Sequence, residues 1–402
     1  MKNKNKKVDP EQGRKVFVGV SGGVDSSVSL ALLKAATPNN YEKLFGRPTP
    51  KGFRGYDVVG VFIRTWTPDF IECTWRDERR DAMRVCAHLD VPFLECDAEK
   101  EYKQGVADYM IAEYKRGRVP NPDVMCNREV KFGVFWRFAQ RHGADFIATG
   151  HYAQVSRKLK VESKKSGVKN YKNKKLDKLD TLYKLLTGRD SAKDQSYFLW
   201  TLTEEDLART LFPIGHLAKS QVRKLAEKFG LPTATKKDSQ GVCFLGPLDM
   251  KEFLKHYIKS KKGNVENTKG EVIGHHDGAL FFTLGERHGF NIDKKTASDK
   301  PYFVVAKDIK RNVLVVSENK NEFKKDSAEI KLGSVVVRGE LHVGRKYEAQ
   351  IRYHGELLPV KILACQKGTM TLKFLKFDPS ISPGQSVVIY DGAVCLAGGV
   401  VL

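Results

Sequence analysis

The stretch KVFVGVSGGVDSSVSLALLKAA, residues 15–36, decides the fold. It opens with a short apolar run that predicts a strand, and it closes with apolar residues at the spacing of a helix. Between them lies SGGVDSS, in which Gly22 and Gly23 let successive backbone N–H groups converge on one anion. The positive end of the following helix favours the same ligand. The stretch predicts a phosphate-binding loop, and a tight glycine turn capped by serine is the purely structural alternative.

The loop lacks one residue of the common phosphate-binding pattern. That pattern, G-x-x-x-x-G-K-[ST], requires a lysine, and this stretch contains none before Lys34. It contains Asp25 instead, whose carboxylate repels phosphate unless a cation lies between them, and a bound Mg²⁺ would supply that cation. We therefore expect a nucleotide site that does not use a γ-phosphate lysine.

The first half of the chain alternates strand-like and helix-like segments. DVVGVFI (residues 57–63), VPFLEC (91–96) and DFIATG (145–150) predict strands, and helix-length segments separate them. This alternation predicts an α/β domain whose parallel sheet has helices on both faces. Ligands of such sheets bind at the carboxyl ends of the strands, where VSGGVDSS and ATGHY both fall.

The remaining sequence predicts two further domains. A helix and short strands with glycine turns predict a small central domain at residues 247–316, and strands at about ten-residue spacing predict an all-β domain at 317–402, a small β-barrel or a sandwich. The α/β domain with the glycine loop would then span residues 1–246, with an N-terminal tail at 1–14. Two segments, 38–55 and the lysine-rich 157–180, look like insertions on the surface.

Composition narrows the partners and the location. The formal net charge is +22, which predicts a polyanionic partner, most commonly nucleic acid. No apolar run is long enough to span a membrane, and the lysine-rich N-terminus lacks a secretory signal pattern, so we expect a cytoplasmic protein. Seven cysteines without a C-x-x-C pair argue against a disulfide framework and against a structural zinc site.

Two cysteines have chemically suggestive neighbours. Cys126 lies in RVPNPDVMCNREVKF (residues 118–132), where the prolines predict a stiff turn before a helix. Arg128 and Lys131 would favour its thiolate, and Asp123 could act as a general acid or base beside it. Cys243 lies in KKDSQGVCFLG (236–246), a predicted loop with two lysines nearby. A helix-start residue and a buried cysteine are the respective structural alternatives, and for the other five cysteines we expect simple packing.

At this point the chain resembles a known family. SGGVDSS is similar to the motif of PP-loop ATP pyrophosphatases, which break the α–β bond of ATP, adenylate a substrate oxygen and need no γ-phosphate lysine. Further blocks narrow the resemblance to the tRNA-specific 2-thiouridylase family; they include NPDVMCNREVKF, DFIATGHYA, KDQSYFLW, FFTLGERHGF and SPGQSVVIYDGAVCLAGGV, in the same order. The resemblance covers nearly the whole chain. It implies ATP-dependent 2-thiolation of the wobble uridine of tRNA by persulfide sulfur, with Mg²⁺ accompanying ATP and a separate protein donating the sulfur.

Carried over residue by residue, the resemblance implies three groups of site residues. The residues that bind ATP would be Gly19, Val20, Ser21, Gly22, Gly23, Val24, Asp25, Ser26, Ile63 and Gly150. Asn121, Pro122 and Asp123 would hold the target base, with Cys126 resolving the persulfide and Cys243 carrying it. The residues that contact tRNA would be His151, Lys193, Asp194, Gln195, Arg352, Tyr353 and Gln385. Ile63 departs from the family, because FIRTW stands where a pattern like F-M-K-N-W is usual.

Two other functions remain open at this stage. Another PP-loop adenylating enzyme, for example one with an amine nucleophile, would need no cysteine chemistry, so Cys243→Ser would leave its activity intact. A noncatalytic RNA-binding protein with a vestigial nucleotide loop would bind tRNA without cleaving ATP, so Asp25→Asn would change nothing.

Overall fold

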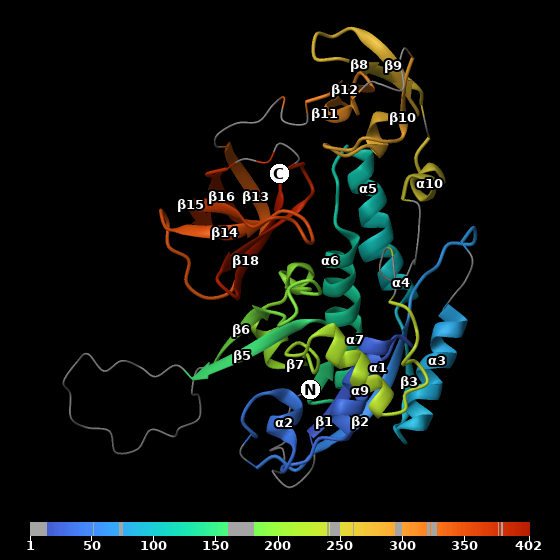
Figure 1. Cartoon of the computed structure of the whole chain (residues 1–402), viewed down its shortest axis with the longest axis vertical. Coiled ribbons are helices and arrows are strands. Elements are labelled where there is room, and N and C mark those ends of the chain that lie inside the picture. Colours follow the sequence, from blue (N-terminus) through green and yellow to red (C-terminus); the bar gives the residue numbers. More distant parts are fainter. Residues whose placement is uncertain are drawn as a thin grey trace, which may run out of the picture.

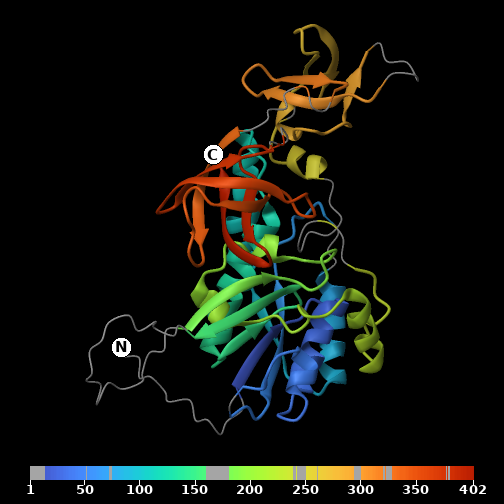
Figure 2. The same ribbon diagram turned by 60° about the vertical axis from the view of Figure 1, so that its left-hand side comes forward.

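The computed structural model describes residues 14–50, 52–71, 75–159, 181–238, 241, 250–259, 261–293, 300–319, 322, 328–376, 378 and 381–402. Most of the predicted tail at 1–14, most of the basic insert and Cys243 lie outside these residues. Within them, the chain forms an α/β unit, a small β unit and a barrel, as Figures 1 and 2 show.

The predicted α/β domain is confirmed by its sheet. The strands pair in parallel in the order β3-β2-β1-β4-β7. Their bounds are β1 (Arg14–Gly19), β2 (Tyr56–Arg64), β3 (Phe93–Asp97), β4 (Phe146–Ala148) and β7 (Thr210–Leu211). Because side chains alternate along a strand, Val16 and Val18 enter one core while Phe17 enters another. Both faces of the sheet are therefore covered.

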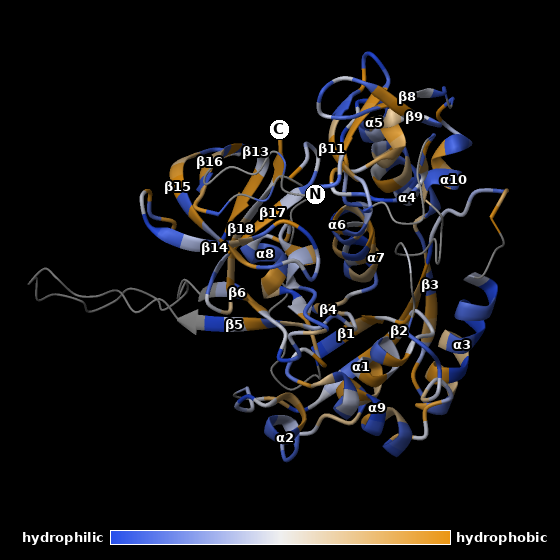
Figure 3. Ribbon diagram, turned by 45° about the horizontal axis from the view of Figure 1, so that its top comes forward, coloured by the Kyte–Doolittle hydropathy of each residue, from blue (hydrophilic) through white to orange (hydrophobic). Residues whose placement is uncertain are grey.

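Different helices cover the two faces. One face packs against α1 (Val24–Lys34), α3 (Trp75–His88) and α9 (Lys219–Lys228). The other packs against two long helical segments that each contain a π-helix. These are α4 (Glu99–Tyr102), η1 (Lys103–Asp108) and α5 (Tyr109–Lys115), followed by α6 (Pro122–Cys126), η2 (Asn127–Val134) and α7 (Phe135–Arg141). Figure 3 shows α3 and α9 as largely hydrophilic, in keeping with their position at the surface.

The two predicted insertions need correction. Residues 38–55 are not a plain surface excursion, because α2 (Tyr41–Phe45) inserts Tyr41 and Phe45 into the core beside α1. Aromatic side chains bury large apolar areas, which explains why this short helix is held in place. The lysine-rich insert begins later than predicted, since residues 157–159 belong to β5 (Ala153–Leu159).

The central β unit packs on the end of α5. Its strands are β8 (Gly263–Glu266), β9 (Val272–His276), β10 (Phe290–Ile292), β11 (Phe303–Asp308) and β12 (Val313–Ser317), in the order β10-β9-β8-β12-β11. The short helices α10 (Met250–Lys255) and η4 (Ala279–Phe281) complete it. Met110 and Ile111 of α5 share its hydrophobic core, so this unit is anchored to the α/β unit.

A closed barrel forms the C-terminal part. Its described strands are β13 (Ala328–Val337), β14 (Lys346–Gln350), β15 (Leu358–Gln366), β16 (Thr369–Phe374), β17 (Ser386–Asp391) and β18 (Val394–Val401). They follow the order β13-β16-β15-β14-β17-β18, and β13 pairs with β18 to close the ring. The hairpin of β5 and β6 (Thr181–Thr187) extends the sheet from β18. Strand pairing therefore crosses the predicted domain boundary.

A short helical segment joins the barrel to the α/β unit. The 3-10 helix η3 (Ser196–Leu199) and the following Trp200 lie against the barrel. Tyr197 donates its hydroxyl proton to the carbonyls of Ile351 and Ser386, at 3.2 and 3.1 Å. From the barrel, Arg338 is 1% exposed and donates to the carbonyls of Trp200 and Leu202 at 2.6 and 2.7 Å. We call residues 196–202 together with Arg338 the junction. Helix α8 (Glu204–Ala208) follows it.

Candidate nucleotide and substrate site

The glycine loop follows β1 directly, as predicted. Gly22 adopts φ +71°, and a Cβ there would lie 2.4 Å from the carbonyl oxygen of Glu78 in α3, so only glycine fits. Ser26 Oγ accepts the N–H of Ser21 at 3.2 Å, and Ser27 Oγ donates to the carbonyl of Gly23 at 2.7 Å. The loop is thereby fixed before α1 begins at Val24. Its geometry fits an anion at the helix N-terminus.

Gly150, at the end of β4, lies against this loop. A Cβ at Gly150 would come within 2.7 Å of the Ser26 nitrogen and 2.8 Å of the Asp25 carbonyl carbon. Gly150 therefore allows the chain after β4 to pack directly against the start of α1. Its contact with ATP stays a prediction. Ile63 is 6% exposed in the core near Gly19, so its side chain supports the loop from below.

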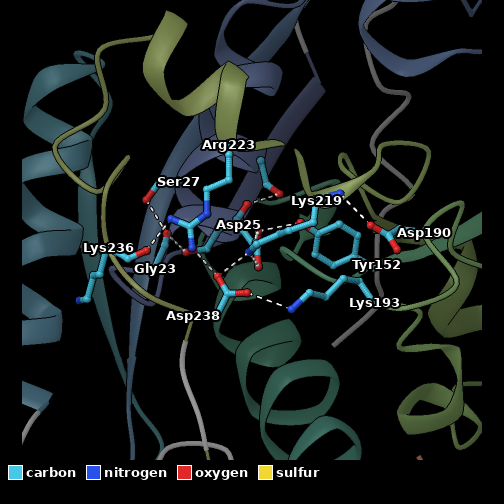
Figure 4. A network of polar contacts seen from close by, with 12 residues as sticks. Gly23, Asp25, Ser27, Tyr152, Asp190, Lys193, Lys219, Arg223, Lys236 and Asp238 are labelled. Atoms are coloured by element: carbon cyan, nitrogen blue, oxygen red, sulfur yellow. Dashed lines mark hydrogen bonds and ion pairs between the residues drawn. The ribbon is translucent and has the colours of Figure 1, made fainter. Parts of the chain in front are cut away.

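A lysine from a distant helix neutralises Asp25. Lys219, at the start of α9, donates to both carboxylate oxygens of Asp25, at 2.7 and 2.8 Å, and Tyr152 donates to Oδ1 at 2.8 Å (Figure 4). The cation next to Asp25 in the structure is thus an ammonium group of the protein, where the sequence suggested a metal ion. Burial and then the charge of Asp25 raise the pKa of Tyr152 far above its usual value, so its hydroxyl stays a donor.

The same lysine connects Asp25 to a second carboxylate. Lys219 lies 2.9 Å from Asp238, which also binds Arg223 at 2.6 Å and Lys193 at 3.0 Å. Partial burial opposes the ionisation of Asp238, but hydrogen bonds from Lys219 and Lys193 outweigh it and lower the pKa to about 2. Figure 4 shows these side chains converging in front of the glycine loop. The network holds cations of α9 beside the predicted phosphate site.

A cavity of about 540 Å³ opens beside this network. Its wall brings together four segments that are far apart in sequence. They are the glycine loop (Ser21, Gly23, Val24, Asp25, Ser26), the α6–η2 helix (Asp123, Asn127, Lys131), residues around Lys193, Gln195 and Phe198, and the barrel residues Tyr353 and His354. His151, Tyr152, Lys237, Asp238 and Gly241 complete the lining. The volume is that of an ordinary small-ligand site.

The proline-containing motif forms the helix start that the sequence predicts. Asn121 caps α6 by accepting the backbone N–H groups of Asp123 and Val124 at 3.1 and 3.2 Å, and Pro122 is the first helical residue. Asp123 reaches the cavity wall, whereas Cys126 is 0% exposed and belongs to the hydrophobic core. Chemistry at the Cys126 sulfur therefore requires a movement that exposes it.

His151 and Asn127 on the cavity wall are both buried. His151 is 6% exposed, and its Nδ1 lies 2.7 Å from the Thr149 hydroxyl. Burial, followed by the charge of Lys131, holds the pKa of His151 well below its usual value, so the ring is neutral. Asn127 donates to the Phe198 carbonyl at 3.2 Å, while its Oδ1 has no hydrogen-bond partner among the described residues.

The predicted tRNA contacts separate into two sets. Lys193, Gln195, His151 and Tyr353 lie on the cavity wall. Asp194 instead holds the chain that enters η3, because its carboxylate accepts the N–H groups of Gly188 and Ser196 at 2.7 and 3.1 Å. Arg352 is exposed, and Gln385 accepts the Ser382 N–H at 2.9 Å in the turn before β17. The alternating stretch YEAQIRYHG (residues 347–355) predicts a strand through Arg352 and Tyr353, but β14 ends at Gln350 and both residues lie in the turn after it.

The remaining described cysteines follow the packing prediction with one exception. Cys86, Cys96 and Cys395 are buried, and burial raises the pKa of Cys86 and of Cys96 to about 12. Cys365 is exposed on β15, so the prediction of a packed side chain was wrong there. Cys365 pairs with Met370 close to the β15–β16 turn, and residues 363–366 at this end of β15 are all exposed.

Sequence reasoning missed several residues of the site. Lys219 and Arg223 lie in the stretch LFPIGHLAKSQVRKLAE (residues 211–227) and Asp238 lies in KKDSQGVCFLG, yet no role was assigned to them from the sequence. Their signal was a lysine and an arginine four residues apart at a helix start, which share one helical face. Phe198 lies three residues after Gln195 and His354 directly after Tyr353, but neither residue type by itself indicates a binding role.

Known protein families match the three units of this chain, each over its own range of residues. The arrangement is that of a nucleotide-binding α/β domain joined to two β domains: residues 52–247 match the tRNA methyl transferase HUP domain, 251–318 the tRNA methyl transferase PRC-barrel domain and 334–401 the aminomethyltransferase β-barrel domain. Among the described residues, no helix is long and apolar enough to cross a membrane.

Curated relatives match over almost the full length. The tRNA-specific 2-thiouridylase MnmA of Halalkalibacterium halodurans is 40% identical over 397 residues, which is 98% of this chain and 95% of the relative. That of Enterococcus faecalis is 38% identical over 392 residues, covering 96% and 95%. The chain belongs to the tRNA-specific 2-thiouridylase family. A solved U34-tRNA thiolase, NcsA from Methanococcus maripaludis, is 14% identical with a TM-score of 0.33 over 61% of this chain and 66% of that one, too distant to support an inference.

Proposed function

We propose that this protein is a tRNA-uridine 2-sulfurtransferase that converts the wobble uridine of tRNA to 2-thiouridine with consumption of ATP. The observation that carries the proposal is the single cavity that unites the glycine loop, Asp123, Lys193, Gln195 and Tyr353. A phosphate site and candidate RNA contacts thus border the same space. Full-length similarity to tRNA-specific 2-thiouridylases supports the same function.

ATP fits the loop described above. The backbone N–H groups of residues 21–26 and the start of α1 would hold the β- and γ-phosphates. Gly22 and Gly150 allow the close backbone packing around this loop, since a Cβ at either position would collide with the backbone of the protein. Mg²⁺ would arrive bound to the phosphates, because no group of three or more His, Cys, Asp or Glu side chains among the described residues could hold a metal ion. Lys219 would balance the charge of the departing pyrophosphate.

The reaction has two chemical steps. First, the C2 carbonyl oxygen of the uridine attacks the α-phosphorus, and pyrophosphate leaves with the electrons of the α–β bond. Next, the terminal sulfur of a Cys243 persulfide attacks C2 and AMP leaves. Cys126 then attacks the Cys243 sulfur, which breaks the S–S bond, leaves sulfur on C2 and forms a Cys126–Cys243 disulfide. A thiol reductant resets the enzyme. Asp123, which lines the cavity, would move protons at the base.

Two partners follow from this chemistry. A sulfur-donor protein must load Cys243, because nothing in the chain resembles a cysteine desulfurase. The tRNA would be held by phosphate contacts from lysines such as Lys193 and Lys237 on the cavity wall, and its anticodon base would be turned out into the cavity. We further propose that the protein acts in the cytoplasm, where tRNA and thiol reductants are available.

One experiment tests the function. The protein is incubated with unmodified tRNA, ATP, Mg²⁺, cysteine and a cysteine desulfurase, and 2-thiouridine is measured by mass spectrometry. We expect product with the wild type and with Cys365→Ser, which changes an exposed cysteine that does not line the cavity. We expect none with Cys243→Ser or Cys126→Ser. Normal yield with Cys243→Ser would refute the sulfur chemistry, and normal yield with Asp25→Asn would refute the role of the loop.

A further inference from the structure

A row of three aromatic rings lies on the barrel side of the cavity. The ring centroids of Phe198 and Tyr353 are 4.4 Å apart, and those of Tyr353 and His354 are 3.8 Å apart at an interplanar angle of 25°. All three residues line the cavity. The row begins in η3 and continues in the turn after β14, so its inner end is fixed by the junction.

The outer ring of the row is held by an unusual backbone. His354 is exposed, yet its φ is +56°, in the left-handed region that non-glycine residues seldom adopt. Such a conformation persists only where its surroundings enforce it, and it occurs often at functional sites. Here its result is that an imidazole lies flat against Tyr353. Because His354 is exposed, its outward face adds little to core packing.

A flat ring that is exposed beside a nucleic-acid cavity is suited to one kind of ligand. Proteins recognise single-stranded RNA by stacking unpaired bases on aromatic side chains, and each stacked base contributes about 1–3 kcal/mol. When the target base turns into the cavity, its neighbours lose their stacking partners. An aromatic ring at the cavity wall can take the place of the lost stacking partner of one neighbouring base.

We propose that His354, supported by Tyr353 and Phe198, is a stacking subsite for the nucleobase adjacent to the target uridine. The inference rests on the proposed function, since it takes tRNA as the ligand. The occupant is an RNA base and not the adenine of ATP, because the phosphates of ATP are expected at residues 21–26, on the sheet side of the cavity, whereas the rings belong to the barrel side. The subsite would hold the anticodon loop in register for reaction.

The test uses 2-aminopurine, whose fluorescence falls when it stacks. Full tRNA carries 2-aminopurine at position 33 or at position 35, and the fluorescence is recorded as wild-type protein is added. We expect at least twofold quenching at one of the two positions. His354→Asn keeps a residue that tolerates the left-handed backbone but removes the ring, so quenching should disappear and the Kd for tRNA should rise about tenfold. His354→Phe restores the ring and should restore the quenching.

The controls separate this subsite from the function itself. His342→Asn changes an exposed histidine of the barrel that does not line the cavity, and it should leave quenching and affinity unchanged. Quenching retained in His354→Asn would overturn the proposal. So would the absence of quenching at both positions while the wild type still produces 2-thiouridine, an outcome that leaves the proposed function standing. A loss of ATP affinity in His354→Asn with normal tRNA binding would assign the ring to adenine and overturn it as well.

Discussion

Lys219 and Asp25 lie 194 positions apart in the sequence and form a two-oxygen ion pair at 2.7 and 2.8 Å. The glycine loop thus obtains from α9 the lysine that its own motif lacks. Lys219 is 15% exposed and also lies 2.9 Å from Asp238, so its ammonium group is held in place before any nucleotide arrives. A preorganised cation of this kind stabilises negative charge that develops during a reaction.

Lys219→Met should reduce the rate of ATP-dependent pyrophosphate release by about 100-fold or more, because loss of one preorganised electrostatic contact commonly costs that much. Lys219→Arg should retain part of the rate, since the charge remains. The measurement is tRNA-stimulated pyrophosphate release under saturating ATP. Lys224→Met, an exposed lysine of the same helix, is the matched control and should match wild type. An undiminished rate in Lys219→Met would remove the lysine from the phosphate site.

Gly150→Ala should weaken ATP binding by at least tenfold. The added methyl group would lie 2.7 Å from the Ser26 nitrogen, which forces the loop to move. Isothermal titration with a nonhydrolysable ATP analogue measures the effect. Gly368→Ala serves as the control, because a Cβ at this turn between β15 and β16 would have open space around it among the described residues, and Gly368 does not line the cavity. Equal affinity in the two variants would show that the close approach has no consequence for the nucleotide.

The neutral His151 predicts a loss of stability in mild acid. Its folded-state pKa lies below the unfolded value of 6.5, so as pH falls through 6.5 the unfolded chain takes up a proton that the folded one does not. Each pH unit below 6.5 then lowers the free energy of unfolding by up to about 1.4 kcal/mol. His151→Asn should flatten the change in urea midpoint between pH 7 and pH 5, while burial of His216 and His276 leaves a residual slope.

Exposed His342→Gln controls for the loss of an imidazole as such, and it should retain the full wild-type slope. If His151→Asn kept that slope too, the buried ring would not be the group that titrates. The variant also loses the contact with Thr149, so its midpoint at pH 7 should be lower than that of wild type.

Arg338→Met should loosen the barrel from the α/β unit. It leaves the carbonyls of Trp200 and Leu202 without their donor, and each orphaned buried acceptor costs about 1–3 kcal/mol. Limited proteolysis should cleave this variant faster than wild type. Its tRNA affinity should fall, because the barrel residues of the cavity wall would move away from those of the α/β unit. Arg345→Met removes an exposed pair with Asp391 and should change neither. If Arg338→Met were cleaved at the wild-type rate, the junction would not be what holds the barrel on the α/β unit.

The sequence predicted individual helices, strands and loops better than the contacts between segments that are far apart in the chain. The strand, glycine loop and helix at 15–36 could be predicted because their signals lie within one short window, and the Asn121 cap with Pro122 is equally local. The ion pair of Lys219 with Asp25 could not, because it depends on how α9 packs beside α1. Burial of Cys126 was also hidden, since a reactive and a packed cysteine at one helical position have the same neighbours in sequence.

The insert at 38–55 shows a further limit of the same kind. Its prolines and glycines indicated a loop, but the side chains of Tyr41 and Phe45 are buried in the hydrophobic core beside α1. Composition counts turn-forming residues and gives little weight to two aromatic side chains, although their buried area decides the outcome. The turn at Arg352 and Tyr353 was likewise missed, because the alternating pattern of β14 continues past its end.

The junction determines what could be exchanged between relatives. Residues 196–202 precede the barrel by more than a hundred positions, yet Arg338 and Ser386 of the barrel bind them directly, and the β5–β6 hairpin pairs with β18. A chimera that grafts a relative's barrel at residue 317 would therefore lack the matching residues 196–202 and β5–β6 hairpin that the barrel binds. The unit that can be exchanged is discontinuous in sequence, and a successful graft would have to include these segments together with the barrel.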